Sequence, residues 1–244
     1  MAPRLRRFSD WARAIRHEER ILRRCVRSLG LTSAHRVLDV GCGYGLKMKA
    51  LSKMGLSVVG IDLQPEVVRT NNAAGMDCMT ADQFARMSDI YDLMLFSHVI
   101  EHFAPDRLLE FMDTYLDRLK AGGYVIIATP LMSSSFYDDF DHIKPYQPIG
   151  INMVFNGQRE QVKYYSRHVL DLRDIWFRRS PFRLTYHAGL YVRGHWRAPV
   201  VANVGLALLF RASFGLIGRT TGWMGLYKKV VRSTMVETCL PGRE

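Results

Sequence analysis

A glycine-rich segment at residues 37–45 has the composition of a ligand-binding loop. It reads Val-Leu-Asp-Val-Gly-Cys-Gly-Tyr-Gly, so a short apolar run leads through Asp39 to three alternating glycines, Gly41, Gly43 and Gly45. A strand that ends in such a loop can bring its backbone against a ligand, because glycine has no side chain in the way and adopts turns that other residues avoid. A helix is expected directly after the loop, and its N-terminal amides would face the same pocket.

A further acidic residue follows the next apolar run. Residues 58–61 read Val-Val-Gly-Ile and lead into Asp62 and Leu63. An acid at the tip of a second strand can accept hydrogen bonds from both hydroxyls of a ribose. Nicotinamide enzymes prefer the spacing G-x-G-x-x-G, whereas this chain has D-x-G-x-G-x-G. An acid at the position of Asp39 would repel a pyrophosphate and would suit a cationic ligand group.

With these two motifs the chain resembles the class I S-adenosylmethionine-dependent methyltransferases over about residues 33–130. The resemblance implies S-adenosylmethionine as the cofactor, with the glycine loop against its methionine portion and Asp62 on its ribose. It also implies an acid near the adenine amino group, for which Asp82 stands in the right place; Gln83 is an alternative, and both residues could instead cap a helix. The other implied cofactor contacts are Asp39, Leu63, Ser97 and His98.

Three polar residues follow the expected fourth strand. His98, Glu101 and His102 stand at i, i+3 and i+4, so they share one face of a helical turn. Imidazole and carboxylate groups on one face can bind a divalent metal, and the small-RNA 2′-O-methyltransferases use a similar Glu-x-x-Glu-His cluster. His98 stands where that subgroup has its first glutamate, so we expect no metal. Glu101 and His102 are instead candidate catalytic residues, or they orient a loop by hydrogen bonds.

The segment 137–146 follows the expected fifth strand and resembles a segment of methyltransferases from surface-polysaccharide and O-antigen gene clusters. It contains several aspartates and then reads His142-Ile-Lys144-Pro-Tyr. Histidine is well suited to accept a hydroxyl proton, so His142 is the predicted general base. Asp139 or Asp141 would fix its tautomer, and Lys144 would pair with a phosphate or uronate. A rigid acidic turn is the alternative.

The charge of +11 is unevenly distributed over the 244 residues. The basic excess lies in residues 1–30 and 151–244, whereas residues 31–150 are acidic on balance. Basic flanks favour an anionic partner: a phosphorylated substrate, a membrane surface or a nucleic acid. The four cysteines contain no C-x-x-C pair, and the N-terminus has no apolar stretch typical of a secretory signal. These features predict a cytoplasmic protein.

The alternation of elements predicts an α/β fold with a Rossmann-like, doubly wound, mostly parallel seven-stranded sheet. Strands are expected at 36–40, 57–61, 76–79, 91–96, 123–128, 182–192 and 232–240. Helices are expected at 9–29, 45–54, 65–73, 83–87, 105–120 and 166–178, with a turn-rich stretch at 129–158. The predicted division is an N-terminal helical lead-in at 1–30, a methyltransferase domain at 31–195 and 230–244, and an apolar and basic insertion at 196–229.

An apolar segment lies within that expected insertion. Residues 198–210 carry no charge, and after Arg211 the apolar run resumes as far as Gly218. The run is short for a membrane span. A location in a membrane interface, at the inner face of the membrane, is expected from its basic neighbours, which are Arg193, Arg197, Arg211, Arg219, Lys228 and Lys229. The alternative is an insertion that lines the substrate pocket or a dimer contact.

Together these features predict an S-adenosylmethionine-dependent O-methyltransferase acting on a hydroxyl of a glycan or glycolipid intermediate. The acceptor is expected to be anionic or lipid-linked. One alternative is a quinone or other natural-product O-methyltransferase, since the segment 98–102 also resembles the ubiquinone-pathway enzymes. An RNA methyltransferase is a second alternative, which the basic flanks suit. No N/D-P-P-Y/F motif of amino-group methylation follows the fourth strand, so nucleic acid is the less favoured partner.

Overall fold

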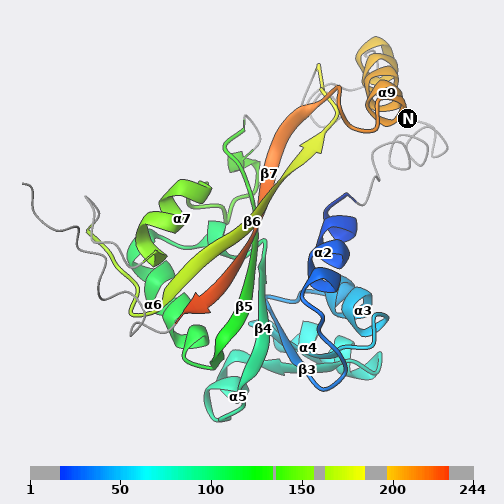
Figure 1. Cartoon of the computed structure of the whole chain (residues 1–244). Helices are drawn as coiled ribbons and strands as arrows, with labels where there is room; N and C mark the ends of the chain where they lie inside the picture. Colours follow the sequence, from blue (N-terminus) through cyan, green and yellow to red (C-terminus); the bar gives the residue numbers. More distant parts are fainter. Residues whose placement is uncertain (1–16, 134–135, 157–162, 185–196, 231–244) are drawn as a thin grey trace, which may run out of the picture.

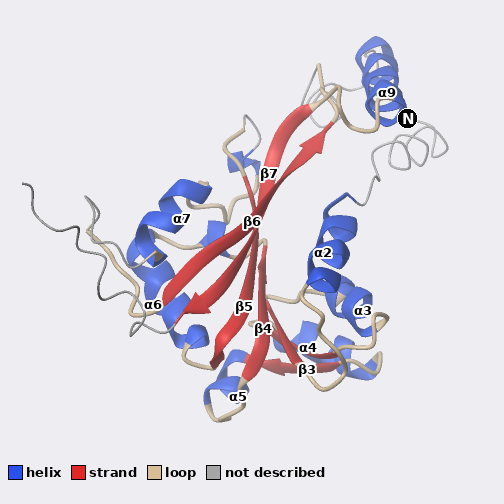
Figure 2. Cartoon of the chain, in the orientation of Figure 1, coloured by secondary structure: helices blue, strands red, loops and turns tan. Residues whose placement is uncertain are grey.

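A mixed sheet organises the part of the chain that the computed structural model describes, residues 17–133, 136–156, 163–184 and 197–230 (Figure 1, Figure 2). The strand order is β3-β2-β1-β4-β5-β7-β6, in which the first five are parallel and β7 is antiparallel to β5 and β6. The strands are β1 (Arg36–Val40), β2 (Ser57–Asp62), β3 (Asp77–Thr80), β4 (Tyr91–Ser97), β5 (Leu119–Pro130), β6 (Val169–Ser180) and β7 (Arg219–Val230). This topology confirms the predicted seven-stranded, mostly parallel sheet.

Helices cover both faces of this sheet (Figure 1). One layer consists of α2 (His17–Ser28), α3 (Leu46–Ser52) and α4 (Pro65–Ala73), and the other of α5 (Ala81–Ala85), α6 (Pro105–Leu116) and α7 (Pro148–Phe155). The apolar side of each helix is buried against the strands, with Leu22 and Leu51 in the first core and Phe84 and Met112 in the second. Two single turns, η1 (Ile100–His102) and η2 (Phe136–Asp138), follow β4 and β5.

The parallel strands bring the candidate site residues to one edge of the sheet. β1 pairs with β2 and β4, and β4 pairs with β5. The loops after these strands therefore meet at the carboxyl edge, where open α/β sheets bind their ligands. The predicted elements from residue 36 to residue 116 are confirmed with shifts of a few residues. α7 was not predicted, because it lies in the stretch expected to consist of turns.

The helix predicted at 166–178 is wrong, because Val169–Ser180 form strand β6. Val169, Leu172 and Trp176 have the spacing of a helical face. The strand has irregular pairing between Leu172 and Asp174 and again between Arg178 and Arg179. Such bulges break the two-residue alternation by which a strand is recognised.

The predicted insertion at 196–229 is also wrong at its C-terminal end, because Arg219–Val230 form β7 inside the sheet. Trp223 and Tyr227 are buried in one core and Met224 in the other, so this strand is covered on both faces. Of the strand predicted at 182–192, residues 182–184 have no regular structure and the remainder lies outside the described residues. The strand predicted at 232–240 and the first part of the helix predicted at 9–29 also lie outside them.

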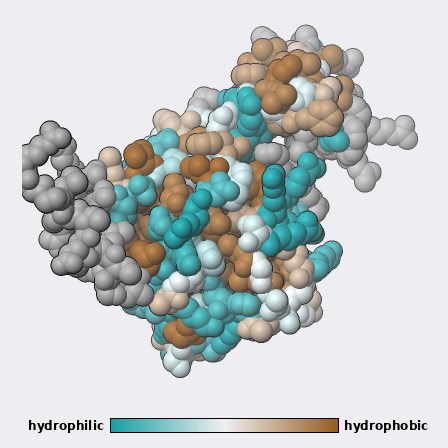
Figure 3. All heavy atoms as spheres, viewed as in Figure 1, coloured by the Kyte–Doolittle hydropathy of each residue, from teal (hydrophilic) through white to brown (hydrophobic). Residues whose placement is uncertain are grey.

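The apolar segment forms α9 (Arg197–Ala212), which stands apart from the sheet at the end of the long β6–β7 pair (Figure 1). Ala207 and Phe210 are buried, whereas Val201, Leu208 and Leu209 are exposed. Figure 3 shows hydrophobic side chains gathered over this helix. Among the described residues, no helix is long and apolar enough to cross a membrane.

Candidate active site

At two of the three glycines of the loop, neighbouring side chains leave no room for a Cβ atom. Gly41, Gly43 and Gly45 have φ angles of 70°, 50° and 69°, which favour glycine. A Cβ atom on Gly41 would lie 2.5 Å from Cγ2 of Val99, and one on Gly45 would lie 2.5 Å from the sulfur of Met76. A Cβ atom on Gly43 would meet no described atom within 4 Å. Gly43 therefore borders open space in which a ligand can approach the backbone.

Asp62 closes this loop from the end of β2. Its Oδ2 atom accepts a hydrogen bond of 2.9 Å from the backbone N–H of Gly43, and Oδ1 accepts one of 2.9 Å from the N–H of Gln64. These bonds fix the carboxylate beside Gly43. The loop backbone itself is tied to β2, because the N–H groups of Gly41 and Cys42 both donate to the carbonyl of Ile61.

Asp39 lies beneath the loop with its side chain almost completely buried. Its Oδ2 atom has no hydrogen-bond partner among the described residues. Burial raises the pKa of this carboxyl to about 7, and the positive charge of Lys47 opposes that rise. A buried carboxylate oxygen that lacks a partner is costly, and a cationic ligand group placed nearby would compensate for this cost.

Large apolar side chains surround the loop mouth, where Tyr44, Leu46 and Leu63 are all more than 60% exposed. Exposed apolar groups beside a polar cradle suit a ligand with both a flat ring and charged ends. Asp82 is exposed in the first turn of α5. Gln83 is used in the capping box with Thr80, where each side chain bonds the other residue's backbone N–H. The alternative assignment of Gln83 to the ligand is therefore less favourable than Asp82.

His98 sits at the end of β4 in an unusual backbone conformation, with a φ angle of 58°. Non-glycine residues adopt such angles rarely, mostly at functional sites. Its Nε2 atom lies 3.1 Å from Oε2 of Glu18 on α2, and its Nδ1 atom lies 3.3 Å from Oε1 of Glu101. The neighbouring Ser97 hydroxyl is 3.5 Å from Glu18. Both Ser97 and His98 thus face the N-terminal helix.

Glu18 is the centre of a charged cluster that spans three distant parts of the chain. Arg178 of β6 donates a 2.9 Å hydrogen bond to its Oε2 atom, and Lys47 of α3 lies 3.4 Å from Oε1. Burial alone would raise the pKa of Glu18, but His98, Lys47 and Arg178 outweigh burial and lower that pKa strongly. Burial would lower the pKa of His98, yet Glu101 and Glu18 raise it overall. The cluster therefore favours a charged carboxylate and a charged imidazole.

Glu101 has a fully buried side chain in η1. Its Oε2 atom accepts a 3.0 Å hydrogen bond from the Thr129 hydroxyl of β5. Its backbone carbonyl accepts from the N–H groups of Ile143 and Lys144. Burial would raise the pKa of Glu101, but His98 and Thr129 outweigh it and lower that pKa. The residue joins the end of β4 to the segment that carries His142.

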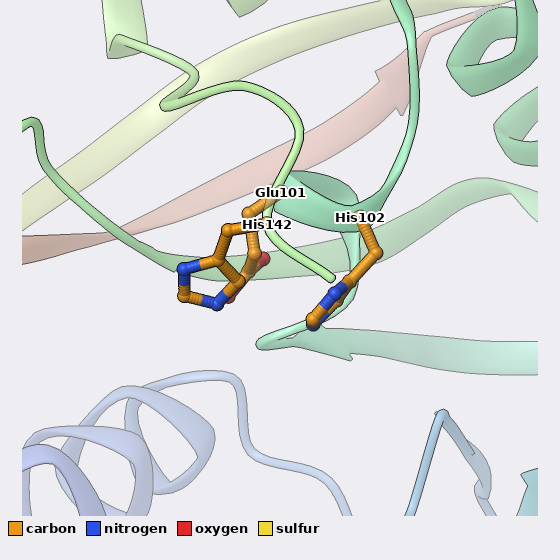
Figure 4. Close-up of side chains that lie close together, drawn as sticks. All are labelled: Glu101, His102 and His142. Carbon is orange, nitrogen blue, oxygen red and sulfur yellow. The ribbon is translucent and has the colours of Figure 1, made fainter. Parts of the chain in front are cut away.

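His142, which follows η2, and His102 of η1 have side chains that lie close together (Figure 4). The Nδ1 atom of His142 lies 2.7 Å from the carbonyl of Phe136, and the Nδ1 atom of His102 lies 3.1 Å from the carbonyl of Asp141. A carbonyl only accepts, so each ring carries its proton on Nδ1 in this arrangement. Each Nε2 atom is then left with a lone pair, and the ring centroids are 5.0 Å apart.

The orientation of His142 has a different source from the one predicted. The Phe136 carbonyl, and not the Asp139 or Asp141 carboxylate, fixes its tautomer. Asp139 lies 3.7 Å from the opposite ring nitrogen, Nε2. The ammonium of exposed Lys144 lies 5.3 Å from the ring centroid of Tyr146, which is a cation–π contact.

The structure brings together a set of possible metal ligands that differs from the predicted face. Ligand atoms of Glu101, His102 and His142 all lie within 4.8 Å of one another, whereas His98 faces Glu18 on the other side of Glu101. The Glu101 carboxylate is already engaged by Thr129 and lies within ion-pair distance of His98. The three side chains have the ligand types and the spacing of a metal site, and the Oε1 atom of Glu101 has no hydrogen-bond partner among the described residues, so the expected absence of a metal remains a prediction.

Sequence reasoning missed Glu18 and Arg178. Glu18 belongs to an arginine-rich helix, in which a glutamate resembles an ordinary solvent-exposed residue. Arg178 lies in the segment that was predicted to be a helix. The two residues are 160 positions apart and meet only because β6 returns to the sheet beside α2. No local spacing signals such a contact.

Comparison with known proteins identifies the domain. Residues 6–186 match the model of a family described as methyltransferase domain. The Ubiquinone biosynthesis O-methyltransferase of Rhizobium etli (strain CFN 42) is 35% identical over 102 residues, covering 38% of this chain and 40% of that protein. The Parvibaculum lavamentivorans protein of the same name is 31% identical over the same shares. The chain thus spans about two fifths of the length of these curated relatives.

Solved structures show the same fold at low sequence identity. A SAM-dependent methyltransferase from Archaeoglobus fulgidus aligns with a TM-score of 0.55 and 20% identity, covering 86% of this chain and 94% of that one. Magnesium protoporphyrin IX methyltransferase from Synechocystis PCC 6803, solved with bound SAM, aligns with a TM-score of 0.53 and 11% identity over 86% and 76%. Likeness at this level of identity concerns the fold alone.

Proposed function

The chain belongs to the methyltransferase domain family, and we propose that it is an S-adenosylmethionine-dependent O-methyltransferase acting on a hydroxyl of a glycan or glycolipid intermediate. The observation that carries the proposal is the pairing of an open glycine loop with a histidine whose Nε2 lone pair is available at the same edge of the sheet. The first feature suits the methyl donor, and the second suits an acceptor hydroxyl.

Residues at or just after the ends of β1, β2, β3 and β4 would hold the cofactor. Asp62 would bind the ribose hydroxyls, Asp82 the adenine amino group, and the backbone at Gly43 the methionine portion. The unpaired Oδ2 atom of Asp39 would accept from the cationic amino group. Ser97 and His98 would line the end nearest the acceptor. When bound, S-adenosylmethionine supplies a methyl group whose bond to sulfur breaks as a bond to the acceptor oxygen forms, leaving S-adenosylhomocysteine.

His142 takes the proton from the acceptor hydroxyl through its Nε2 atom. The hydrogen bond from Nδ1 to the Phe136 carbonyl keeps the ring in the tautomer that can do so. The ring of His102 lies 5.0 Å from the ring of His142, centroid to centroid, and helps to orient the hydroxyl. Glu101 is a positioning residue, because its carboxylate is buried and its carbonyl anchors the backbone after His142.

The acceptor class is tested by offering two kinds of hydroxyl. Purified protein is incubated with methyl-labelled S-adenosylmethionine and either lipid-linked oligosaccharides or catechol-type quinol precursors, and label in each product is counted. We expect label in the glycan fraction. Labelling of the quinol alone would favour the alternative, small-molecule O-methylation. Two relatives named Ubiquinone biosynthesis O-methyltransferase support that alternative. No labelling of either would count against both assignments.

We expect turnover to persist after exhaustive chelation. The carboxylate of Glu101 is engaged by the Thr129 hydroxyl and lies close to His98, so the triad with His102 and His142 acts by hydrogen bonding and proton transfer. The measurement compares the rate before and after dialysis against a chelator. Loss of activity that magnesium, manganese or zinc restores would show that the three side chains hold a catalytic ion.

We also propose that the segment 198–218 contacts a membrane surface. Leu208, Leu209, Phe214, Leu216 and Ile217 are each more than 40% exposed, and Arg211 accompanies them. Apolar groups that enter lipid beside a basic residue that meets headgroups are typical of interfacial helices. Lys228 and Lys229 do not take part, because Lys229 bonds the carbonyls of Leu116 and Leu119 and Lys228 packs over Tyr124.

Flotation with liposomes tests this contact. The protein should float with vesicles that contain acidic lipid, less with neutral ones, and salt should weaken the association. Leu208→Glu combined with Leu209→Glu should release it without unfolding. A matched pair, Met87→Glu with Ile90→Glu, changes similarly exposed apolar residues elsewhere and should leave flotation intact. The membrane contact would be contradicted if the two double variants floated equally well. It would also be contradicted if the wild-type protein did not float at low salt.

A further inference from the structure

A small basic cavity lies beside His142, distinct from the glycine loop. Its volume is about 180 Å³, and its walls come from the end of β6, the start of β7 and the segment after β5. Arg178, Arg183 and Arg219 line it together with His142. None of the described residues that line it is acidic. A concentration of guanidinium groups in so small a space favours an anion.

The cavity is held in shape by bonds between β6 and β7. The hydroxyls of Ser180 and Thr221 are 2.9 Å apart, and Arg178 donates a 3.2 Å hydrogen bond to the carbonyl of Thr221. The other end of the same guanidinium meets Glu18. Arg178 is therefore fixed in place, and the carboxylate of Glu18 on α2 largely neutralises its charge.

Arg219 supplies the second observation that points to a ligand. Its Nε–H group is buried and has no hydrogen-bond partner among the described residues. A buried donor of this kind is expensive to leave unpaired. Arg219 also lines the cavity and stands opposite Ser180 in the β6–β7 register, so an oxyanion bound there would lie beside a guanidinium group that still has an unpaired donor.

The geometry points to a subsite that binds an oxyanion of the acceptor, a phosphate or a carboxylate, while its hydroxyl faces His142. The inference deepens the proposed function and rests on it for the role of His142. It assigns Arg219 and Arg183 to recognition of the acceptor. It also narrows the acceptor class to hydroxyl compounds that carry a phosphate or a uronate-type carboxylate.

Calorimetric titration of the full chain with inorganic phosphate, at constant ionic strength in chloride, tests the subsite. Arg219→Gln and Arg183→Gln should each weaken phosphate binding about tenfold or more, the scale for loss of a charge-assisted hydrogen bond. Arg219→Lys should restore part of it. Arg69→Gln removes the same charge from the exposed surface of α4 and should have no effect. Titration with acetate shows which oxyanion is preferred, and either preference supports the subsite.

Circular dichroism first establishes that each variant is folded, and if Arg219→Gln is not, Arg183→Gln decides. Absence of phosphate binding by the wild type, or equal binding by the arginine variants, would overturn the inference. The proposed function fails separately: a protein that binds phosphate through Arg219 but transfers no methyl group keeps the subsite and loses the assigned reaction. A protein that methylates a hydroxyl but binds no oxyanion would keep the assigned reaction and lose the subsite.

Discussion

Gly43→Val is expected to abolish binding of S-adenosylmethionine and of S-adenosylhomocysteine. A Cβ atom at this position would enter space that holds no described atom within 4 Å, so the substitution clashes with a ligand and not with the protein. Wild-type protein should bind in the micromolar range, as measured by titration calorimetry. For the variant we expect no detectable heat.

Two further variants separate ligand exclusion from backbone strain. Gly55→Val also places a side chain at a positive φ angle, 85°, with no described atom within 4 Å, and it lies in the turn before β2. This variant has the same kind of backbone strain but lies outside the proposed cofactor site. Once folded, it should bind S-adenosylmethionine normally. Gly43→Asn relieves part of the strain, since asparagine tolerates this conformation, but its side chain still occupies the site. Normal binding by Gly43→Asn and Gly43→Val would refute the cofactor assignment.

His142→Ala is expected to lower turnover by about 10²–10⁴-fold, the usual contribution of a general base. Cofactor affinity should hardly change, because the residue lies after β5 and not in the glycine loop. Steady-state rates at saturating cofactor, together with a binding titration, measure the two effects separately.

His35→Ala serves as the matched control for this substitution. His35 hydrogen-bonds within the turn before β1, where it meets Thr32. Its removal should leave turnover within a small factor of wild type. If His142→Ala keeps its activity, the segment around it is structural, and His102 becomes the next candidate for the proton acceptor.

The positions of the candidate cofactor-binding residues were predictable because these residues are close in sequence and their pattern is tied to parallel strands. Asp39 lies near the end of β1, Gly43 in the loop after β1 and Asp62 at the end of β2, and a βα unit fixes where such ends meet. The prediction of Gly43 as a point of close approach agrees with the open space beside it. For Gly41 and Gly45 the structure adds a packing reason that the sequence does not contain.

The C-terminal half was harder to predict because its strands lack regular alternation. β6 is interrupted by two irregular pairings, and its apolar residues therefore mimic a helical spacing. β7 is buried on both faces, so Trp223, Met224 and Tyr227 look like a continuation of the apolar segment before them. Because of these two errors, neither Arg178 nor Arg219 was expected beside His142, where both line one cavity.

The polar network around His98 depends on contacts that only the folded chain creates. Glu18, Lys47 and Arg178 come from three elements far apart in sequence. Their convergence holds α2 over the end of β4. The spacing of His98, Glu101 and His102 suggested one shared face, whereas the bend at His98 turns its ring toward Glu18 and leaves His102 beside His142.

Identifying the atom that receives the methyl group tests the proposed O-methylation most directly. The protein is incubated with S-adenosylmethionine carrying a ¹³C-labelled methyl group and with the acceptor that becomes labelled, and the product is analysed by heteronuclear NMR. We expect one new methyl ether, with the labelled carbon attached to oxygen, and far less of it with His142→Ala. A labelled carbon attached to nitrogen or to carbon would contradict the proposed O-methylation.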